Sequence, residues 1–346
     1  MRGTRVSTPA SSRSGLKPTP LIFVLGGARS GTTLLGRILG SHPQVLRLGE
    51  THFFETIWAV ERHKESEGEA RMAGAAQATL ELFERYGQAA GQKAVEAGLT
   101  KEALVETAMD FGGGSLGLLR GFASLLATAA GKRVFCDDTP RHVFFLDVIL
   151  AQLPEARVVA CLRDPRDYLA SYKYHWRRAR EPERVRAIYH PVITSILWRS
   201  TWLAVTRATG AEGRLILNRY EDLVTRPEEQ VRHLCSFLEL DFHPDMLSIE
   251  GSNSSFGDGQ RGVFTSSVGR FHAVLTPEET WACQRINAAG MGRLGYGAER
   301  CRPNPLKLAA IAITTIPALL RGLYANRKRR GALLPYLKRR LHGPFH

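Results

Sequence analysis

Leu21-Ile22-Phe23-Val24-Leu25 is followed directly by Gly26-Gly27-Ala28-Arg29-Ser30-Gly31-Thr32-Thr33-Leu34-Leu35, and this stretch decides the fold. The apolar residues at its start predict a buried strand, and the residues from about Thr32 predict the start of a helix. The glycines between them let backbone N–H groups crowd around an anion, while the helix adds the positive end of its dipole. A strand, a glycine-rich loop and a helix in this order predict a phosphate-binding loop, and therefore a nucleotide-binding protein.

This loop has the glycine spacing of a nucleoside-triphosphate loop but lacks its lysine. The pattern G-x-x-x-x-G-K-[ST] would place a lysine where this chain has Thr32. The positive side chain is instead Arg29, inside the loop, which suits a planar group with fewer charges than a Mg²⁺-bound triphosphate. The loop therefore favours a sulfated nucleotide over ATP.

A second candidate anion site lies in the stretch from Arg157 to Ser171. Arg157–Leu162 predicts a buried parallel strand, Asp164-Pro165 a turn, and the residues after it a helix that carries Ser171. Arg163, at the carboxyl end of that strand, and Ser171 can then face one anion at the edge of the sheet. Taken alone, the charged run is equally well explained as a capped helix start with solvated charges. Together with the glycine loop it predicts a second phosphate site.

On these motifs the chain resembles a sulfotransferase that uses 3′-phosphoadenosine 5′-phosphosulfate (PAPS). The resemblance is to the branch that includes tyrosylprotein sulfotransferases and many bacterial carbohydrate sulfotransferases, and it runs from about Leu21 to Tyr296 with a gap in the middle. It implies PAPS as co-substrate, adenosine 3′,5′-bisphosphate as product, and no metal. The loop residues that it assigns to the 5′-phosphosulfate are Arg29, Ser30, Gly31, Thr32 and Thr33. It assigns Arg163 and Ser171 to the 3′-phosphate.

Two later segments extend this resemblance. Asn218–Leu223 resembles the family's Tyr-Glu-Asp-Leu segment, which implies that Tyr220 contacts the nucleotide. An alternative is that Tyr220 is a packing residue and that the acidic pair after it starts the helix predicted at Pro227–Leu238. Thr265–Phe271 resembles a loop that closes over the adenosine 3′-phosphate; the residues expected to bind there are Ser267 and Arg270.

Sulfuryl transfer needs a base for the acceptor and positive charge near the leaving phosphate. The segment His42–Thr51 resembles the family segment with the catalytic carboxylate, which maps onto Glu50. Arg29 would bridge the sulfuryl group and the leaving phosphate. Other candidate bases stay open. They are His52, which points away from Glu50 if the segment is extended, Glu55, which lies near Glu50 only in a helix, and the histidines at 142 and 175.

The chain departs from the family pattern at Asp138. Cys136–His142 resembles a segment whose lysine neutralises the leaving oxygen, and Asp138 stands at that position. A carboxylate there opposes the developing negative charge unless it is turned away or protonated. The cation would then come from Arg29, Arg141 or Lys132; alternatively the chain binds the nucleotide and catalyses slowly.

The predicted fold class is α/β, with a P-loop-like, mainly parallel central sheet covered by helices. The strands that indicate it are Leu21–Leu25, Val134–Cys136, Arg157–Leu162 and Arg214–Asn218. Residues from about 58 to 131 show no strand pattern and predict a helical insert, broken at Gly112–Gly114. We expect a disordered basic leader at 1–20, one α/β domain at 21–300, and a basic amphipathic tail at 301–346.

Cysteine usage and the leader predict a cytoplasmic protein. The five cysteines form no C-x-x-C pair and no arrangement with zinc spacing, and most lie in apolar runs, which predicts buried free thiols in a reducing compartment. The leader has no apolar segment of the kind found in secretory signals.

The basic charge lies in the tails. Residues 301–346 contain ten Lys/Arg and no Asp/Glu, and residues 1–20 contain four and none, so the core is nearly neutral against a net charge of +14. Leu308–Leu320 is uncharged but, at thirteen residues, is shorter than the roughly 20 that span a bilayer. Two interpretations of this segment stay open. With the clusters Arg327–Arg330 and Lys338–Arg340, an interfacial helix at the inner membrane face is one of them. The alternative is a terminal helix packed on the core; nucleic acid is not an expected partner because few aromatic residues interleave the basic ones.

The predicted function is transfer of a sulfuryl group from PAPS to a hydroxyl or amine of an acceptor, with a carbohydrate or glycolipid favoured. A second hypothesis is a P-loop phosphotransferase, a small-molecule kinase that uses ATP and Mg²⁺, which the missing loop lysine disfavours. A third, a nucleotide-binding scaffold without catalysis, rests on Asp138 alone. The acceptor pocket would be built from the insert and from loops without a motif, so neither the acceptor nor the oligomeric state follows from the sequence.

Overall fold

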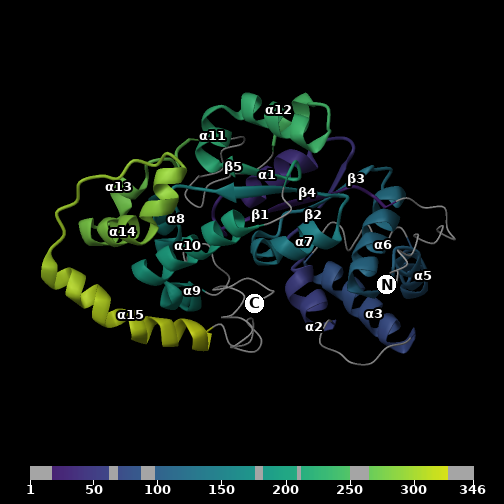
Figure 1. Cartoon of the computed structure of the whole chain (residues 1–346), viewed down its shortest axis with the longest axis horizontal. Helices are drawn as coiled ribbons and strands as arrows, with labels where there is room; N and C mark the ends of the chain where they lie inside the picture. The colour runs from purple at the N-terminus through teal and green to yellow at the C-terminus, as the bar shows by residue number, and fades with distance from the viewer. Residues whose placement is uncertain are drawn as a thin grey trace, which may run out of the picture. The chain divides into compact units, whose positions relative to one another are not determined.

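The computed structural model describes residues 18–61, 69–86, 98–175, 182–208, 212–249 and 265–325 (Figure 1). The chain divides into two compact units: unit 1 comprises residues 1–21 and 44–135, and unit 2 comprises residues 22–43 and 136–346. Unit 1 contains the helical insert. Unit 2 contains the glycine-rich loop and all the predicted nucleotide contacts that follow it in the sequence.

The strands form a five-stranded sheet in the order β2-β3-β1-β4-β5. Their bounds are β1 Leu21–Gly26, β2 Val45–Gly49, β3 Val134–Asp137, β4 Ala156–Leu162 and β5 Leu215–Arg219. β4 and β5 run parallel, with Val158 opposite Leu215 and Leu162 opposite Arg219. Two of the four neighbouring pairs, β3-β1 and β1-β4, are not consecutive in sequence, and helices lie between the strands along the chain, so the predicted α/β class is confirmed.

The helices that follow β1 and β4 place the predicted site residues. α1 (Thr32–Gly40) begins directly after the glycine loop, as expected. α8 (Pro165–Lys173) follows β4; the Asp164 side chain caps it by accepting from Arg166 N, and Pro165 occupies its first turn. Ser171 therefore lies on a helix whose start is set by its own sequence.

One part of the alternative interpretation of the segment around Tyr220 is wrong. α12 has the predicted bounds Pro227–Leu238, but Glu221 and Asp222 do not start it. They lie in a separate short helix, α11 (Tyr220–Thr225). The chain leaves helical geometry at Arg226, with φ −135° and ψ 61°, because the residue before Pro227 is sterically excluded from the helical region.

In unit 1, the described residues between 58 and 131 form helices and no strand, as predicted. A π-helix (Phe54–Trp58) and α2 (Ala59–Glu61) precede α3 (Glu69–Tyr86), α5 (Lys101–Asp110) and α6 (Gly114–Ala129). The break between α5 and α6 falls at Gly112–Gly114, where all three φ values are positive. α5 and α6 pack closely because Gly117 lacks a side chain: a Cβ there would come 2.6 Å from the Ala108 carbonyl oxygen.

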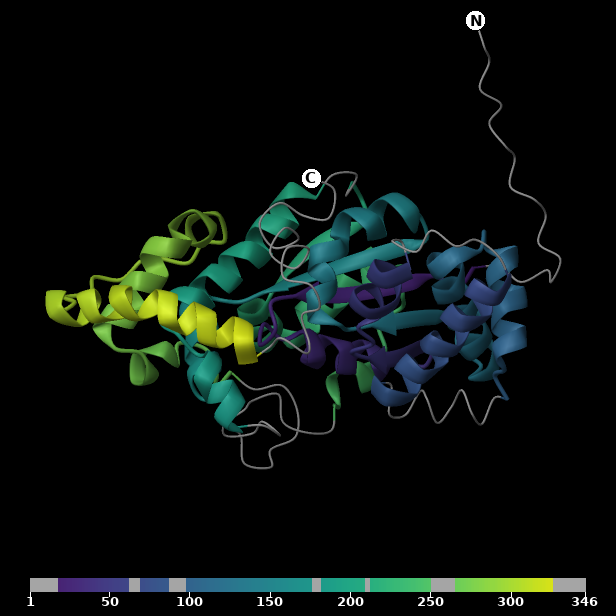
Figure 2. The ribbon, with the colours of Figure 1, turned by 90° about the horizontal axis from the view of Figure 1, so that it is seen from below.

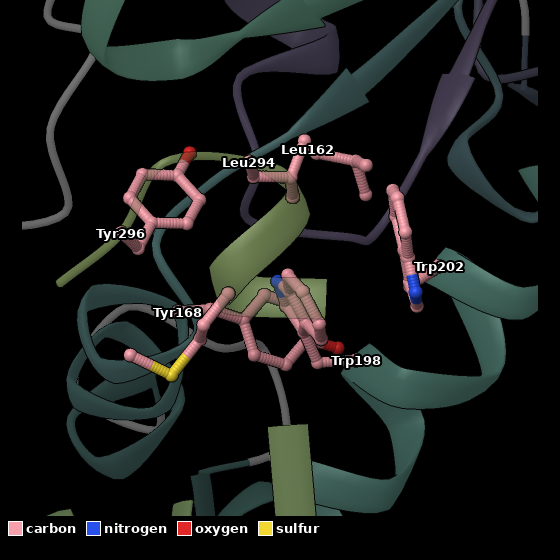
Figure 3. Close-up of a cluster of buried hydrophobic side chains, with 7 residues drawn as sticks. Leu162, Tyr168, Trp198, Trp202, Leu294 and Tyr296 are labelled. Carbon is pink, nitrogen blue, oxygen red and sulfur yellow. The ribbon is translucent and has the colours of Figure 1, made fainter. Parts of the chain in front are cut away.

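In unit 2, a cluster of buried aromatic and aliphatic side chains lies beside the end of β4 (Figure 3). It comprises Leu162, Tyr168, Trp198, Trp202, Met291, Leu294 and Tyr296. The two tryptophans come from α10 (Pro191–Arg207), and α14 (Pro277–Arg293) approaches them at Gly290, where a Cβ would come 2.7 Å from the Trp198 ring. The Trp198 indole donates to the Arg163 carbonyl oxygen at 2.8 Å. The cluster therefore fixes the backbone that carries Arg163.

The remaining elements include α9 (Pro182–Ile188), α13 (Phe271–Val274) and the terminal α15 (Pro305–Ala325), with short 3-10 helices at Pro140–Phe145 and Pro244–Leu247. The C-terminal helix predicted around Leu308–Leu320 is present, but it is longer than that apolar run. Most of the predicted leader, residues 1–17, and the basic clusters after residue 325 lie outside the described residues.

Candidate functional site

The loop between β1 and α1 adopts backbone conformations that depend on glycine. Gly26 has φ 143°, and a Cβ there would lie 2.1 Å from the Cys161 carbonyl oxygen of β4. Gly31 has φ 90°, and a Cβ there would lie 2.6 Å from Cδ2 of Tyr220. Ser30 N donates to the Gly27 carbonyl oxygen at 3.0 Å, which closes the turn. Glycine at these positions lets the loop lie directly against the end of β4 and against Tyr220.

The start of α1 and the serine beside it have the features of an anion site. Gly31 caps α1 without a side-chain hydrogen bond to the first-turn amides. The Ser30 side chain is fully buried, and its Oγ has no hydrogen-bond partner among the described residues. Buried hydroxyls are rarely left without a partner, so this arrangement fits a phosphate or sulfate group with acceptor oxygens.

Arg29 connects the loop to the second motif. Its φ is 75°, which is unusual for a residue other than glycine, and its Nε donates to Ser171 Oγ at 3.2 Å. These residues are 142 positions apart in sequence. The structure therefore brings together the basic side chain of the loop and the serine predicted for the 3′-phosphate.

Arg163 lies beside the same loop. Its side chain is 6% exposed; Nη1 donates to the Arg29 carbonyl oxygen at 3.4 Å, and Nη2 donates to the Ser267 carbonyl oxygen. Its guanidinium lies over the Tyr220 ring, 4.5 Å from the centroid. The Arg163 Nε atom is buried, and no hydrogen-bond partner for it lies in the part of the chain that the structure describes. This contact set joins Arg163 to the loop, to Tyr220 and to the late serine segment.

Tyr220 is a packing residue, as the alternative interpretation held, and it also lies against the loop. It is 2% exposed, and its ring fills the space between Gly31 and Arg163. A direct nucleotide contact from its side chain remains a prediction.

The segment with Ser267 and Arg270 is attached to α8 by an aspartate that the sequence reasoning did not select. Asp167 accepts from Gly269 N at 2.7 Å and from Phe271 N at 2.9 Å. Burial raises the pKa of Asp167, although the nearby charge of Arg163 opposes that shift. Ser267 is buried and Arg270 is partly buried.

Glu221 is a second positioning residue that sequence reasoning missed. It accepts from Asp164 N at 2.9 Å and from the Tyr296 hydroxyl at 2.6 Å, and burial raises its pKa. Asp167 and Glu221 each lie in the first turn of a helix, where acidic residues are common. Their position in the sequence therefore gave no indication of their distant hydrogen-bond partners.

Glu50 belongs to unit 1, where it follows β2. Its side chain is 44% exposed, and its Oε2 lies 3.6 Å from His52 Nε2. The other imidazole nitrogen, Nδ1, lies 3.4 Å from Glu55 Oε1. The segment is not extended: His52 has φ 55° and the chain turns into the helical residues that begin at Phe53. His52 consequently does not point away from Glu50, and the two carboxylates lie beside one imidazole.

The remaining candidates have other surroundings. His142 is buried, with Nδ1 3.3 Å from Asp137 Oδ1. Asp138 is fully buried against α1: a Cβ on Gly36 would come 2.5 Å from the Asp138 Cγ. Its carboxylate therefore packs on the side of α1, about one helical turn beyond Thr32. His175 lies after α8, its ring 6.3 Å from that of Tyr172.

Within the described part of the chain, no group of three or more His, Cys, Asp or Glu side chains has an arrangement that could hold a metal ion. The expectation of a metal-free reaction stays a prediction.

Known proteins that are similar in sequence to this chain include sulfotransferases. Residues 20–244 match the family model described as "Sulfotransferase family". The nodulation protein NoeE of Sinorhizobium fredii is 28% identical over 81% of this chain and 67% of its own length. Protein-tyrosine sulfotransferase 1 of Danio rerio is 26% identical over 87% of this chain and 78% of its own length.

Two solved structures share the fold. The sulfotransferase domain from the curacin biosynthetic pathway superposes with a TM-score of 0.51 at 18% identity, covering 82% of this chain and 100% of that domain. The sulfotransferase domain from the Synechococcus PCC 7002 olefin synthase gives a TM-score of 0.50 at 19% identity, covering 80% and 95%.

The family match spans well over half of the 346 residues and includes the glycine loop, Arg163 and Tyr220. The family match does not favour the kinase hypothesis. Membership of this family implies that the acceptor is a small molecule or a carbohydrate. The chain belongs to the sulfotransferase family and is a transferase that takes its sulfuryl group from PAPS.

Proposed function

We propose that unit 2 binds PAPS with its 5′-phosphosulfate in the glycine-rich loop and its 3′-phosphate at Arg163 and Ser171. The observation that carries this proposal is the hydrogen bond from Arg29 Nε to Ser171 Oγ at 3.2 Å. It joins two anion motifs that lie far apart in sequence, as a ligand with two separate anionic groups requires.

Two buried polar atoms support the fit of such a ligand. Ser30 Oγ and Arg163 Nε are both buried, and the residues that the structure describes offer neither of them a hydrogen-bond partner. The first is a donor on the loop, and the second is a donor on a guanidinium that already contacts the loop and the Ser267 segment. An anion with several acceptor oxygens would satisfy both, which lowers the cost of burying them.

Each loop residue has a role in this proposal. The backbone amides of Gly31, Thr32 and Thr33 and the hydroxyl groups of Ser30 and the threonines orient the phosphosulfate. Arg29 carries the positive charge that stabilises negative charge on the leaving phosphate. Tyr220 holds the loop and Arg163 in register, and Ser267 and Arg270 close over the 3′-phosphate.

Glu50 is the base in this proposal. Its carboxylate takes the proton from the acceptor hydroxyl as the oxygen attacks the sulfur atom. The support is the sequence resemblance of the Gly-Glu-Thr segment together with the exposure of the side chain. His52 lies beside this base, with Nε2 3.6 Å from Glu50 Oε2.

Asp138 bears on the rate rather than on nucleotide binding. Its carboxylate packs against Gly36 on the side of α1, at the position where the resemblance implies a lysine. We propose that Arg29 supplies the cation that this lysine would provide, and that the chain is catalytically active.

The nucleotide site is tested by calorimetric binding of adenosine 3′,5′-bisphosphate and of ATP, each with and without Mg²⁺. Arg163→Ala should weaken bisphosphate binding by about tenfold or more, because a charge-assisted hydrogen bond is worth about 1.5–3 kcal/mol. Arg157→Ala is the matched control: Arg157 lies near the start of β4, whereas Arg163 directly follows its end, and Arg157 Nη1 donates to the Phe237 carbonyl oxygen. Preference for ATP with Mg²⁺, or equal effects of the two variants, would overturn the proposal.

The acceptor class in this proposal is a carbohydrate or a glycolipid with a free hydroxyl or amine. Its support is the resemblance to the branch with bacterial carbohydrate sulfotransferases. The match to a protein-tyrosine sulfotransferase makes a tyrosine peptide the alternative. Transfer of radiolabelled sulfate from PAPS to oligosaccharides, to glycolipids in vesicles and to tyrosine peptides would distinguish them, and labelling of the peptides alone would reject the carbohydrate class.

We also propose a reducing, cytoplasmic location. Four of the five cysteines are buried free thiols, and burial raises the pKa of Cys161 and of Cys283 to about 12, so these thiols are poor nucleophiles. Fractionation of the native cells tests the location; recovery from the extracellular fraction with cysteines oxidised would contradict it.

A further inference from the structure

The terminal helix α15 packs on unit 2 along one side only. It contacts α9 and α10, and Figures 1 and 2 both show it at the periphery of this unit. The less exposed positions recur at helical spacing; they are Leu308, Ile311, Thr315 and Ala318. Near this side, His190 Nε2 and Thr314 Oγ1 form a hydrogen bond of 3.2 Å. One side of α15 is thus accounted for by packing within the chain.

The opposite side of α15 is apolar and exposed, and Figure 2 looks onto the helix from outside. It carries six of the ten large hydrophobic side chains that are exposed among the described residues. Their exposed fractions are Leu306 81%, Ile313 75%, Ile316 68%, Leu319 43%, Leu320 62% and Tyr324 66%. A helix that is apolar around its whole circumference is normally buried by protein or by lipid. These six side chains therefore indicate that something else covers this outer face.

The basic residues of this C-terminal segment favour an anionic partner. Lys307 and Arg321 bracket the uncharged run 308–320, and the residues from 301 to the last one contain ten Lys/Arg and no Asp/Glu. Seven of these basic residues follow Ala325. An apolar stripe on a segment whose own charges are all positive matches a bilayer of anionic lipids, where the side chains enter the acyl region and the cations remain at the headgroups.

The same charges argue against two other occupants. A second copy of this chain would bring another segment of ten positive and no negative charges against the first. A membrane-spanning arrangement is compatible with the 21-residue length and the composition of α15. However, the uncharged run between Lys307 and Arg321 is about 20 Å long as a helix, which is shorter than the hydrocarbon core of a bilayer at about 30 Å. Spanning would also remove α15 from α9 and α10.

We propose that α15 lies flat in the interface of an anionic membrane, with its outer apolar face inserted and its inner side still packed on α9 and α10. This docking surface holds the catalytic unit at a lipid surface. It does not depend on which residues bind PAPS or on which acceptor is sulfated.

Sedimentation of the purified full-length chain with vesicles tests the proposal. The two vesicle types are phosphatidylcholine alone and phosphatidylcholine mixed with phosphatidylserine. We expect binding to the anionic vesicles that weakens as salt is raised, and little binding to the neutral ones. The double variant Ile313→Glu, Leu320→Glu should lose about tenfold or more of this affinity, because two inserted side chains become charged.

Met109→Glu is the matched control, because Met109 is 60% exposed on α5 and receives the same charge change outside α15. This variant should bind vesicles like the wild type. All the proteins should bind adenosine 3′,5′-bisphosphate equally, which separates a failure of this proposal from loss of the fold or of the nucleotide site.

Three results would overturn the proposal. The first is absence of wild-type binding to anionic vesicles, or equal binding of the double variant. The second is a wild-type dimer that the double variant dissociates, which would identify a second copy as the occupant. The third is resistance of the membrane-bound protein to both high salt and alkaline carbonate, which would identify a spanning helix.

Discussion

Arg29 is the side chain at which two distant stretches of sequence meet. Its Nε donates to Ser171 Oγ, and its carbonyl oxygen accepts from Arg163 Nη1. The first contact joins residues 142 positions apart and the second residues 134 apart, so no local pattern contains them. Single substitutions at these partners therefore report on the tertiary arrangement of the site.

Ser171→Ala should lower the affinity for adenosine 3′,5′-bisphosphate by about tenfold, because it removes a hydrogen bond to a charged group and leaves Arg29 without its Ser171 contact. Calorimetric titration measures this loss. Ser200→Ala is the control: Ser200 is a similarly buried serine on α10 whose hydroxyl donates to the Leu197 carbonyl oxygen. Equal affinities of the two variants would show that Ser171 does not contact the nucleotide.

Glu50→Gln should lower kcat by about a hundredfold or more while leaving bisphosphate affinity within a factor of about two, since the amide cannot take the acceptor's proton. Glu55→Gln is the matched control, because the two carboxylates lie at 3.6 and 3.4 Å from the nitrogens of the same imidazole. Steady-state turnover with a labelled donor gives the comparison. A larger loss in Glu55→Gln would move the role of base to Glu55.

At the scale of the elements, the shape of the glycine loop depends on backbone conformations that only glycine adopts without strain. Gly31→Ala forces φ 90° on a residue with a Cβ and brings that Cβ against Tyr220. Gly112 offers a matched comparison, because its φ is 91° and a Cβ there would meet nothing within 4 Å. The two substitutions share the backbone strain and differ in the steric clash.

Both variants should lose about 1–2 kcal/mol of the free energy of unfolding from the positive φ. Gly31→Ala should lose a further 1–3 kcal/mol or so from overpacking, and only this variant should lose bisphosphate binding. Denaturant unfolding and calorimetry measure the two effects. Equal destabilisation with intact binding would mean that the loop relaxes away from Tyr220.

The attachment of α15 should depend on pH through His190. Burial, the largest effect, and the charge of Arg321 lower the pKa of His190, and a backbone contact at Ile311 opposes that shift. Because the folded-state pKa lies below the unfolded value of about 6.5, the unfolded state takes up the proton first as the pH falls. The attachment is therefore fully stable above about pH 6.5 and weakens below it.

Hydrogen exchange of the α15 amides above and below this pH tests the attachment of the helix. We expect smaller protection factors, each the intrinsic exchange rate divided by the measured rate at the same pH, at the lower pH in the wild type, and no such change in His190→Gln. His233→Gln, at an exposed position of α12, is the control and should behave like the wild type. Protection factors that are independent of pH in the wild type would show that His190 does not control the attachment.

At the level of the whole chain, the predicted functions divide between the two compact units. The glycine loop, Arg163, Ser171, Tyr220 and the Ser267 segment belong to unit 2, whereas Glu50 and the helices α3, α5 and α6 belong to unit 1. Hydrogen exchange with saturating bisphosphate should therefore show protection concentrated in unit 2. The Arg163→Ala variant should show little protection under the same conditions.

Protection of α3, α5 and α6 should require an acceptor in addition to the nucleotide. A bisphosphate that protected these helices as strongly as the loop would contradict the division of roles. The comparison needs no knowledge of the acceptor, since the nucleotide alone provides the first measurement.

Much of the fold could be predicted from residues that are adjacent in the chain. The strand, loop and helix around Gly26–Gly31, the helix that follows Asp164-Pro165 and the bounds of α12 all depend on local spacing, capping and proline geometry. Only the alternative, in which the acidic pair Glu221 and Asp222 begins α12, is wrong, because these residues lie in the separate helix α11. The family resemblance rests on the same short motifs, and the family match agrees with it.

The contacts that shape the candidate site could not be predicted in this way. Asp167 holds the amides of residues 269 and 271, Arg29 reaches Ser171, and Asp138 is buried against Gly36. Local spacing establishes which segments become strands, loops and helices, because those preferences act over a few residues. Which side chains then meet depends on how these elements pack, and packing joins residues more than a hundred positions apart, so these contacts appear only in the folded chain.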